Sequence, residues 1–156
     1  PTVHCYPDEW LSSTNDQYQL SFVNNWLGSH FLDAQYALRK PVLVAEFGKS
    51  WKGSGYSTYK RDQIFNSVYN KIYASAKRGG AAGGALFWQL LTEGMESFQD
   101  GYGVMLGQSS STANVIAQQS HKLYLLRKIF ARMRNTHRGK RARAKRGGNR
   151  GGQIGN

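Results

Sequence analysis

The chain has 156 residues, a length that suits one domain, and it carries 21 Lys and Arg residues against nine Asp and Glu, for a formal net charge of +12. Its longest mostly apolar run, residues 81–91, contains Gln89 and is too short to span a bilayer, so we expect no membrane partner. The single cysteine, Cys5, excludes an intrachain disulfide and is expected to be a small buried hydrophobic residue.

The positive charge is concentrated at the C-terminal end. Residues 127–156 hold eleven Lys and Arg and no acid, whereas residues 1–126 hold ten Lys and Arg against nine acids, a balance of +1. We therefore expect a near-neutral folded part over residues 1–130. The basic Arg/Gly-rich tail over residues 131–156 has almost nothing apolar to bury and is predicted to be disordered.

The chain opens with a short predicted strand and a long predicted helix. Residues 2–6 form the strand, which Pro7 ends because proline offers no N–H to a neighbouring strand. Residues 7–17, rich in Asp, Ser and Asn, are predicted to be a loop. From about Tyr18 the apolar residues recur every three to four positions, the pattern of a helix that packs one face onto a sheet. They are Leu20, Val23, Leu27, Phe31, Ala34 and Leu38.

A second predicted strand ends at an acidic residue. After Pro41, residues 42–45 are all apolar, which is typical of a parallel strand buried on both faces. Active sites of α/β proteins lie at the carboxyl ends of such strands, and Gly48 allows the backbone to turn away after Glu46. Glu46 is therefore a candidate catalytic carboxylate, and the alternative is a solvated loop glutamate.

The remaining elements continue the same alternation. A second helix includes residues 64–76 and ends at Gly79, a third strand covers residues 85–88, and a last helix has its apolar face over residues 116–130. Strands that alternate with helices predict a parallel sheet. Three strands do not close a barrel, and the chain begins at Pro1 without an initiator Met. We therefore expect the later part of a longer protein, with the last three units if that protein is an eight-stranded barrel.

Four motifs occur together in a specific order and spacing. They are His4-x-Tyr6-Pro7-Asp8-x-Trp10, Lys40-Pro41-Val42-Leu43-x-x-Glu46-Phe47-Gly48, Leu86-Phe87-Trp88-Gln89-Leu90 and Asp100-Gly101-Tyr102-x-Val104. With these motifs the chain resembles the C-terminal portion of the plant endo-β-1,4-mannanases of glycoside hydrolase family 5, from Pro1 to about Arg127. The resemblance implies an α/β fold, namely about three βα units from the C-terminal portion of a (β/α)8 TIM barrel.

The resemblance implies that Glu46 is the nucleophile of a retaining glycosidase. Such a mechanism needs a second carboxyl group roughly 5–5.5 Å away, which protonates the leaving oxygen. The family supplies this acid/base from an Asn-Glu-Pro segment, which this sequence does not contain, so we expect the chain alone to be inactive. The other candidate acids lie in predicted loops, match no acid/base motif and are expected to be solvated or to cap turns. They are Asp8, Glu93, Glu96 and Asp100.

Aromatic residues and one histidine are candidates for sugar binding. His4 and Tyr6 are two residues apart on a strand, so their side chains point to the same side of the sheet. For a lone pair of this kind, a buried pair bonded to the backbone is the alternative. The resemblance implies instead that both line the site, with Tyr6 near the nucleophile and Trp88 as a platform for the sugar ring. Trp10 and Trp51, in loops after strands, are further candidates for the sugar groove.

The implied substrate is a β-mannan, either galactomannan or glucomannan, in the plant cell wall, and the implied location is extracellular. No cofactor is expected. No metal site is expected either, since His137 has no second ligand at metal-binding spacing.

Two readings of the basic tail stay open, because the motifs end before it. Interleaved Arg and Gly resemble segments that bind nucleic acid through phosphate contacts, and a polybasic run can also be a nuclear address. The alternative is an appended segment without a role. The rival to the hydrolase hypothesis is thus a non-catalytic remnant whose basic tail binds nucleic acid.

Overall fold

The computed structural model describes the backbone of residues 1–12 and 15–148, and the side chains of this range up to residue 136. The chain divides into two compact units, one from Pro1 to His121 and one that starts at Lys122. The first unit contains the sheet and every candidate site residue named above, so the two units are described separately.

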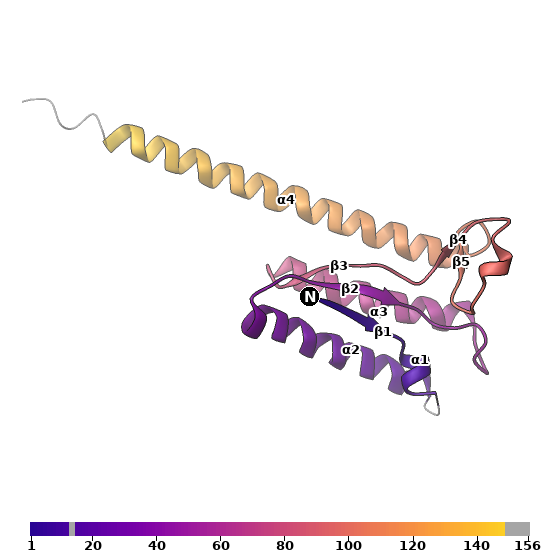
Figure 1. Ribbon diagram of the computed structural model, residues 1–156. Coiled ribbons are helices and arrows are strands. Elements are labelled where there is room, and N and C mark those ends of the chain that lie inside the picture. Colours follow the sequence, from indigo (N-terminus) through magenta and orange to yellow (C-terminus); the bar gives the residue numbers. More distant parts are fainter. Residues whose placement is uncertain (13–14, 149–156) are drawn as a thin grey trace, which may run out of the picture. The chain divides into compact units, whose positions relative to one another are not determined.

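A parallel three-stranded sheet lies at the centre of the first unit (Figure 1). Its strands are β1 (Thr2–Cys5), β2 (Val42–Phe47) and β3 (Ala82–Ala85), in the order β1-β2-β3. The chain between β1 and β2 forms α1 (Pro7–Trp10), α2 (Asp16–Leu32) and the π-helix η1 (Asp33–Leu38), and the chain between β2 and β3 forms α3 (Thr58–Lys77). Parallel neighbours joined through helices are βαβ units, which confirms the predicted α/β class.

The ends of the two long helices follow from local sequence. The side chain of Asn15 accepts a hydrogen bond from Tyr18 N–H over 2.8 Å, so α2 begins at Asp16 rather than at Tyr18. Ser57 caps α3 in the same way, with a 3.3 Å bond from an N–H in the first turn. α3 ends as predicted, because Gly79 has a φ of +69° and lets the backbone leave the helix.

The apolar core lies between β2 and α3. The Phe47 ring lies 4.8 Å from that of Phe65 and 5.4 Å from that of Tyr69, and Phe65 also contacts Phe87 at 5.6 Å. Phe47 and Phe65 are fully buried. These aromatic residues on the helix are therefore core residues, not sugar-binding ones.

The exposure of β2 differs from the prediction of a strand buried on both faces. Val42 and Val44 are buried, whereas Leu43 and Ala45, which follow them in turn, are only half-buried. In the first unit α3 packs against α2 and against β3, so these helices cover one face of the sheet. The opposite face, which carries Leu43, is covered less completely by the described residues.

Two other local predictions need correction. The predicted third strand, residues 85–88, is shifted, because β3 ends at Ala85. Hydrogen bonds to β2 nevertheless continue past this end, since the N–H groups of Leu86 and Trp88 donate to carbonyls of β2 over 2.9 and 2.8 Å. The loop predicted from Pro7 begins with the short helix α1, because proline is favourable in a first helical turn.

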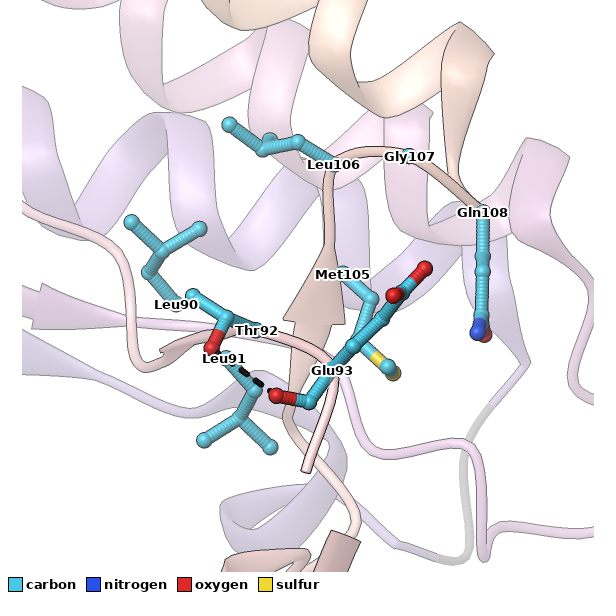
Figure 2. A pocket seen from close by; sticks show the side chains of 8 residues that line it. All are labelled: Leu90, Leu91, Thr92, Glu93, Met105, Leu106, Gly107 and Gln108. Carbon is cyan, nitrogen blue, oxygen red and sulfur yellow. Dashed lines mark hydrogen bonds between the residues drawn. The ribbon is translucent and has the colours of Figure 1, made fainter. Parts of the chain in front are cut away.

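A small second sheet follows β3. Its strands β4 (Leu90–Leu91) and β5 (Val104–Met105) pair in parallel, and the 3₁₀-helix η2 (Glu96–Phe98) lies between them in sequence. Figure 2 shows the hollow beside this pair, which has a volume of about 460 Å³ and is lined by residues 90–93 and 105–108. Of the candidate acids named above Glu93 lines it, whereas Glu46, His4, Tyr6 and Trp88 do not.

The last helix, α4 (Ser110–Gly148), is fixed to the first unit near its start. Thr112 is fully buried, and its hydroxyl accepts hydrogen bonds from Arg61 and donates one to Asp62. Both charged residues are themselves buried on α3. A buried polar network of this kind specifies how two helices pack, because each of its members would be costly to leave unpaired.

The second unit continues α4 from Lys122 to Gly148. The helical backbone thus enters the segment for which we predicted disorder, and its many Arg, Lys and Ala residues have high helix propensity. Residues 149–156, the rest of that prediction, lie outside the described residues. Among the described residues, no helix combines the length and hydropathy required to cross a membrane.

Candidate active site

Glu46 lies near the end of β2, opposite His4 of β1. The Tyr6 hydroxyl donates a hydrogen bond to Glu46 Oε2 over 2.9 Å, and His4 Nδ1 lies 3.4 Å from the same oxygen. The Glu46 side chain is 36% exposed, so it can be reached from solvent. The structure therefore brings together three of the residues that the sequence indicated, around one carboxylate at the carboxyl end of a parallel strand.

A register shift between β1 and β2 determines which way Glu46 faces. Two consecutive residues of β1 pair with Val44 and Glu46, which leaves Ala45 without a partner on β1. Under strict alternation Glu46 would share the face of the fully buried Val44. The extra residue resets the alternation, as a β-bulge does, so Glu46 faces His4 while Phe47 enters the core.

The environment of Tyr6 keeps its hydroxyl neutral. Burial, the hydrogen bond to Glu46 and the negative charge of Glu46 raise the pKa of Tyr6 well above its ordinary value of about 10. Tyr6 is therefore a hydrogen-bond donor to the carboxylate throughout the neutral range. A donor of this kind stabilises the ionised, oriented form that a nucleophile needs.

Trp88 is held by an acidic partner. Its indole N–H donates to Asp100 Oδ2 over 2.6 Å, and the other oxygen of Asp100 accepts from Tyr102 N–H over 2.9 Å. Burial alone would raise the pKa of Asp100, but the hydrogen bonds from Trp88 and Tyr102 outweigh it and lower that pKa. Asp100 thus stays ionised and fixes an indole that is 41% exposed.

Tyr102 supports the Glu46 site through its contact with Tyr6, and the sequence analysis did not predict this role. Its ring contacts the Tyr6 ring edge to face at 5.1 Å, and its hydroxyl donates to Glu9 over 2.8 Å. Gly48 makes room for it, because a Cβ there would lie 2.7 Å from Tyr102 and 2.9 Å from the Trp88 carbonyl. The only signal was the presence of Tyr102 in the fourth motif.

The two candidate groove residues, Trp10 and Trp51, differ in their distance from the Glu46 site along the chain of contacts. Trp10 is 45% exposed and packs against Phe22 and Trp26 of α2, so the structure places it in a separate aromatic cluster. Trp51 is 46% exposed, and its backbone N–H bonds to the Gly101 carbonyl over 2.8 Å. Trp51 therefore lies beside the segment that holds Trp88, whereas no described contact joins Trp10 to Glu46.

The other carboxylates have different partners. Asp8 Oδ2 accepts from Ser50 N–H over 2.7 Å, and Glu96 accepts from Gly94 N–H over 3.1 Å. Asp100 holds Trp88, as described above. The group at Glu46 can thus attack an electrophile, but no described contact supplies it with a second carboxyl group as a proton donor.

Metal and thiol chemistry find no support in the described part of the chain. Across these residues, no group of three or more His, Cys, Asp or Glu side chains could hold a metal ion. Cys5 is fully buried, as predicted, and burial followed by the charge of Asp8 raises its pKa to about 12. The thiol therefore stays protonated and unreactive at neutral pH.

Comparison with known sequences finds close relatives in plants. The chain is 60% identical over 154 residues to mannan endo-1,4-β-mannosidase 7 of Arabidopsis thaliana, and 57% identical over 133 residues to mannan endo-1,4-β-mannosidase 1 of Oryza sativa subsp. japonica. It is similar to part of the plant mannan endo-1,4-β-mannosidases. This confirms the resemblance carried by the four motifs. The alignments cover 99% and 85% of the chain but 34% and 31% of these relatives, so the chain spans about a third of their length. No protein-family model matches the chain.

Solved structures agree on the fold. The glycoside hydrolase family 5 mannosidase from Rhizomucor miehei matches with a TM-score of 0.66 at 20% identity, over 81% of this chain and 38% of that protein. An endo-β-1,4-mannanase from Thermotoga petrophila matches with a TM-score of 0.54 at 22% identity, over 76% of this chain and 25% of that protein. The chain therefore has the fold of part of a family 5 TIM barrel, as predicted.

The alignment with the Arabidopsis relative also corrects the extent of the resemblance. We expected it to stop at about Arg127, but 99% coverage of the chain includes the basic segment over residues 131–156. The motifs that carried the resemblance all lie before residue 105, so they could not indicate this.

The raised pKa of Tyr6 predicts a late titration at alkaline pH. Ionised tyrosine absorbs at 295 nm, so this absorbance is measured against pH for the wild-type chain and for Tyr6→Phe. The difference in absorbance between the two should stay near zero at pH 10 and appear only above it. The Tyr6–Glu46 contact also contributes to folding stability. Because the pKa of Tyr6 is higher in the folded than in the unfolded chain, this contribution is complete below pH 10 and is lost as the pH rises through the folded-state pKa. A difference curve centred near pH 10 would contradict the contact with Glu46.

Proposed function

We propose that the chain is the nucleophile-bearing part of a retaining endo-β-1,4-mannanase. The observation that carries the proposal is Glu46 at the end of β2, with Tyr6 and His4 on one of its oxygens. A carboxylate that is solvent-accessible, oriented by a neutral donor and set at the carboxyl end of a barrel strand suits attack on a sugar carbon. The plant relatives, which are mannan endo-1,4-β-mannosidases by name, supply the substrate class.

Glu46, Tyr6 and Trp88 have different roles in the first chemical step. A Glu46 oxygen forms a bond to the anomeric carbon as the bond from that carbon to the glycosidic oxygen breaks. Tyr6 holds the attacking carboxylate in place, and Trp88 offers its exposed indole face to the C–H face of the sugar ring. The departing oxygen needs a proton from a second carboxyl group, which the Asn-Glu-Pro segment of the family would supply.

The substrate that we propose is a cell-wall β-mannan, galactomannan or glucomannan, and the place of action is outside the cell. Both follow from the plant relatives rather than from a contact in the structure.

The 156-residue chain should bind mannan without cleaving it. We expect no release of reducing sugar from galactomannan, because one carboxyl group cannot both attack and protonate. Calorimetry should nevertheless detect binding of 1,4-β-mannohexaose, and Trp88→Ala should weaken it by about tenfold or more, since a central aromatic contact dominates such sites.

Tyr36→Ala is the matched control for that experiment, because Tyr36 is an exposed aromatic residue on η1, before β2 begins. It should leave the affinity unchanged. Release of sugar that Glu46→Ala abolishes would show that the chain is catalytically complete. Absence of any binding by the folded wild-type chain would remove the support for a mannan site.

A second candidate function concerns the basic segment, residues 127–156. Its eleven Lys and Arg residues without an acid favour binding to a polyanion such as RNA. The described cations of this segment, Arg127, Lys128, Arg132 and Arg134, are all exposed on α4.

Electrophoretic mobility shift with single-stranded RNA tests this function. The whole chain should retard the RNA at 50 mM salt and bind it at least tenfold more weakly at 200 mM, because binding releases counterions. A chain that ends after Phe130 should lose the shift. Equal retardation by both chains would eliminate the segment as the binding element.

A further inference from the structure

The basic segment, residues 127–156, differs from the rest of the chain in the kind of cation that it carries. Eight of its eleven cations are Arg and three are Lys, whereas residues 1–126 hold three Arg and seven Lys. The guanidinium group of Arg is a planar set of N–H donors that matches the two oxygens of a carboxylate or phosphate group, whereas the ammonium group of Lys is a point charge. The composition therefore indicates recognition of oxyanion groups rather than a general excess of charge.

The described cations of the basic segment have no acidic partner on their own helix, because the sequence of α4 contains no Asp or Glu. Arg127, Arg132 and Arg134 are exposed, and none of them forms an ion pair within the part of the chain that the structure describes. Lys128 Nζ lies 4.4 Å from the centre of the Tyr124 ring, a contact that keeps its positive charge. These side chains can therefore bind an anion from outside the chain.

The helix arranges the four described cations in two rows. Residues seven apart lie two turns apart on the same side of a helix, so Arg127 and Arg134 form one row roughly 10 Å long. Lys128 and Arg132 are four residues apart and form the second row, in which the two like charges repel each other. An anionic polymer that lies along α4 removes this repulsion, whereas a small anion would compensate only one or two of the cations.

The basic segment is poor in aromatic residues. Phe130 is the only Phe, Tyr or Trp among residues 127–156. Proteins that bind single-stranded nucleic acid combine a basic surface with aromatic side chains on which successive bases stack. A polymer of charged sugars has no bases and needs no such stacking. The segment therefore suits an acidic polysaccharide better than it suits RNA.

We propose that the basic segment binds an acidic polysaccharide, namely a polyuronate that carries one carboxylate on each sugar. The exposed guanidinium groups of Arg127, Arg132 and Arg134 donate to successive carboxylates of this polymer. The partner is distinct from the mannan that Glu46 would attack, because a mannan is neutral and offers no anion to these cations. The segment then retains the protein in a polysaccharide matrix, a task separate from cleavage. This inference rests on the proposed function, because it needs the extracellular place of action proposed above.

Biolayer interferometry on immobilised polygalacturonate tests this proposal with the 156-residue chain. At 50 mM salt the chain should bind the polymer, and it should not bind the uncharged methyl ester of the same polymer. Arg127→Gln/Arg132→Gln/Arg134→Gln should weaken the affinity about tenfold, because three exposed ion pairs of modest strength are lost. Gln and Arg have similar helix propensities, so this variant should keep α4 helical.

Lys40→Gln/Lys52→Gln/Lys77→Gln is the matched control, because it removes the same charge at exposed positions of the first unit. It should keep the affinity for polygalacturonate within about twofold of the wild type. An equal loss in both triple variants would overturn the proposal, because the effect would then be one of net charge. Wild-type affinity in the α4 variant, or equally strong binding of the methyl ester, would overturn it as well.

Two further measurements separate this proposal from the others. Free polygalacturonate should displace the chain more effectively than single-stranded RNA at equal charge concentration, and the reverse order would overturn the polyuronate in favour of nucleic acid. In calorimetry with 1,4-β-mannohexaose the α4 variant should bind like the wild type, and Trp88→Ala should bind polygalacturonate like the wild type. A chain that binds polygalacturonate but not mannohexaose would thus contradict the mannan site alone, and the opposite result would contradict the polyuronate alone.

Discussion

The parallel pairing of β1 with β2 is the interaction on which the site depends. Backbone hydrogen bonds place His4 opposite Glu46, and the unpartnered Ala45 turns Glu46 away from the core. Without that irregularity the carboxylate would point toward the face that α3 covers, where an unpaired charge is very unfavourable. The orientation of one acidic side chain is thus a consequence of strand register, and Phe47 stabilises that register by its burial.

The segment from Asp100 to Tyr102 links the two sides of the site. Its carboxylate fixes the indole of Trp88, and its aromatic ring supports Tyr6, so the Trp88 indole and the donor to Glu46 are positioned by the same three residues. Such support outside the reacting groups is what keeps a site in a productive geometry.

Much of the fold followed from periodicity. Apolar residues at helical spacing predicted α2 and α3, and the cap at Gly79 placed the end of α3 correctly. Two features of the sheet could not be predicted. The residues of β3 are small, so their pattern could not show where the strand ends, and the shift at Ala45 depends on pairing with β1, which no local pattern contains.

The site was partly predictable for a similar reason. The two-residue spacing of His4 and Tyr6 and the end of an apolar run at Glu46 are local features, and the structure brings these residues together. The contacts of Asp100, Tyr102 and Asp8 join segments separated by up to 94 positions, so composition and spacing could not reveal them.

Covalent trapping tests the role of Glu46 most directly, because an activated sugar needs no proton donor to leave. With 2,4-dinitrophenyl 2-deoxy-2-fluoro-β-mannoside, a Glu46 oxygen forms the bond to the anomeric carbon, and dinitrophenolate departs with the electron pair of the broken bond. Mass spectrometry of the chain should show the gain of one fluoromannosyl group, located on Glu46 and absent in Glu46→Gln. A group attached to another carboxylate, or an equal gain in Glu46→Gln, would contradict the account.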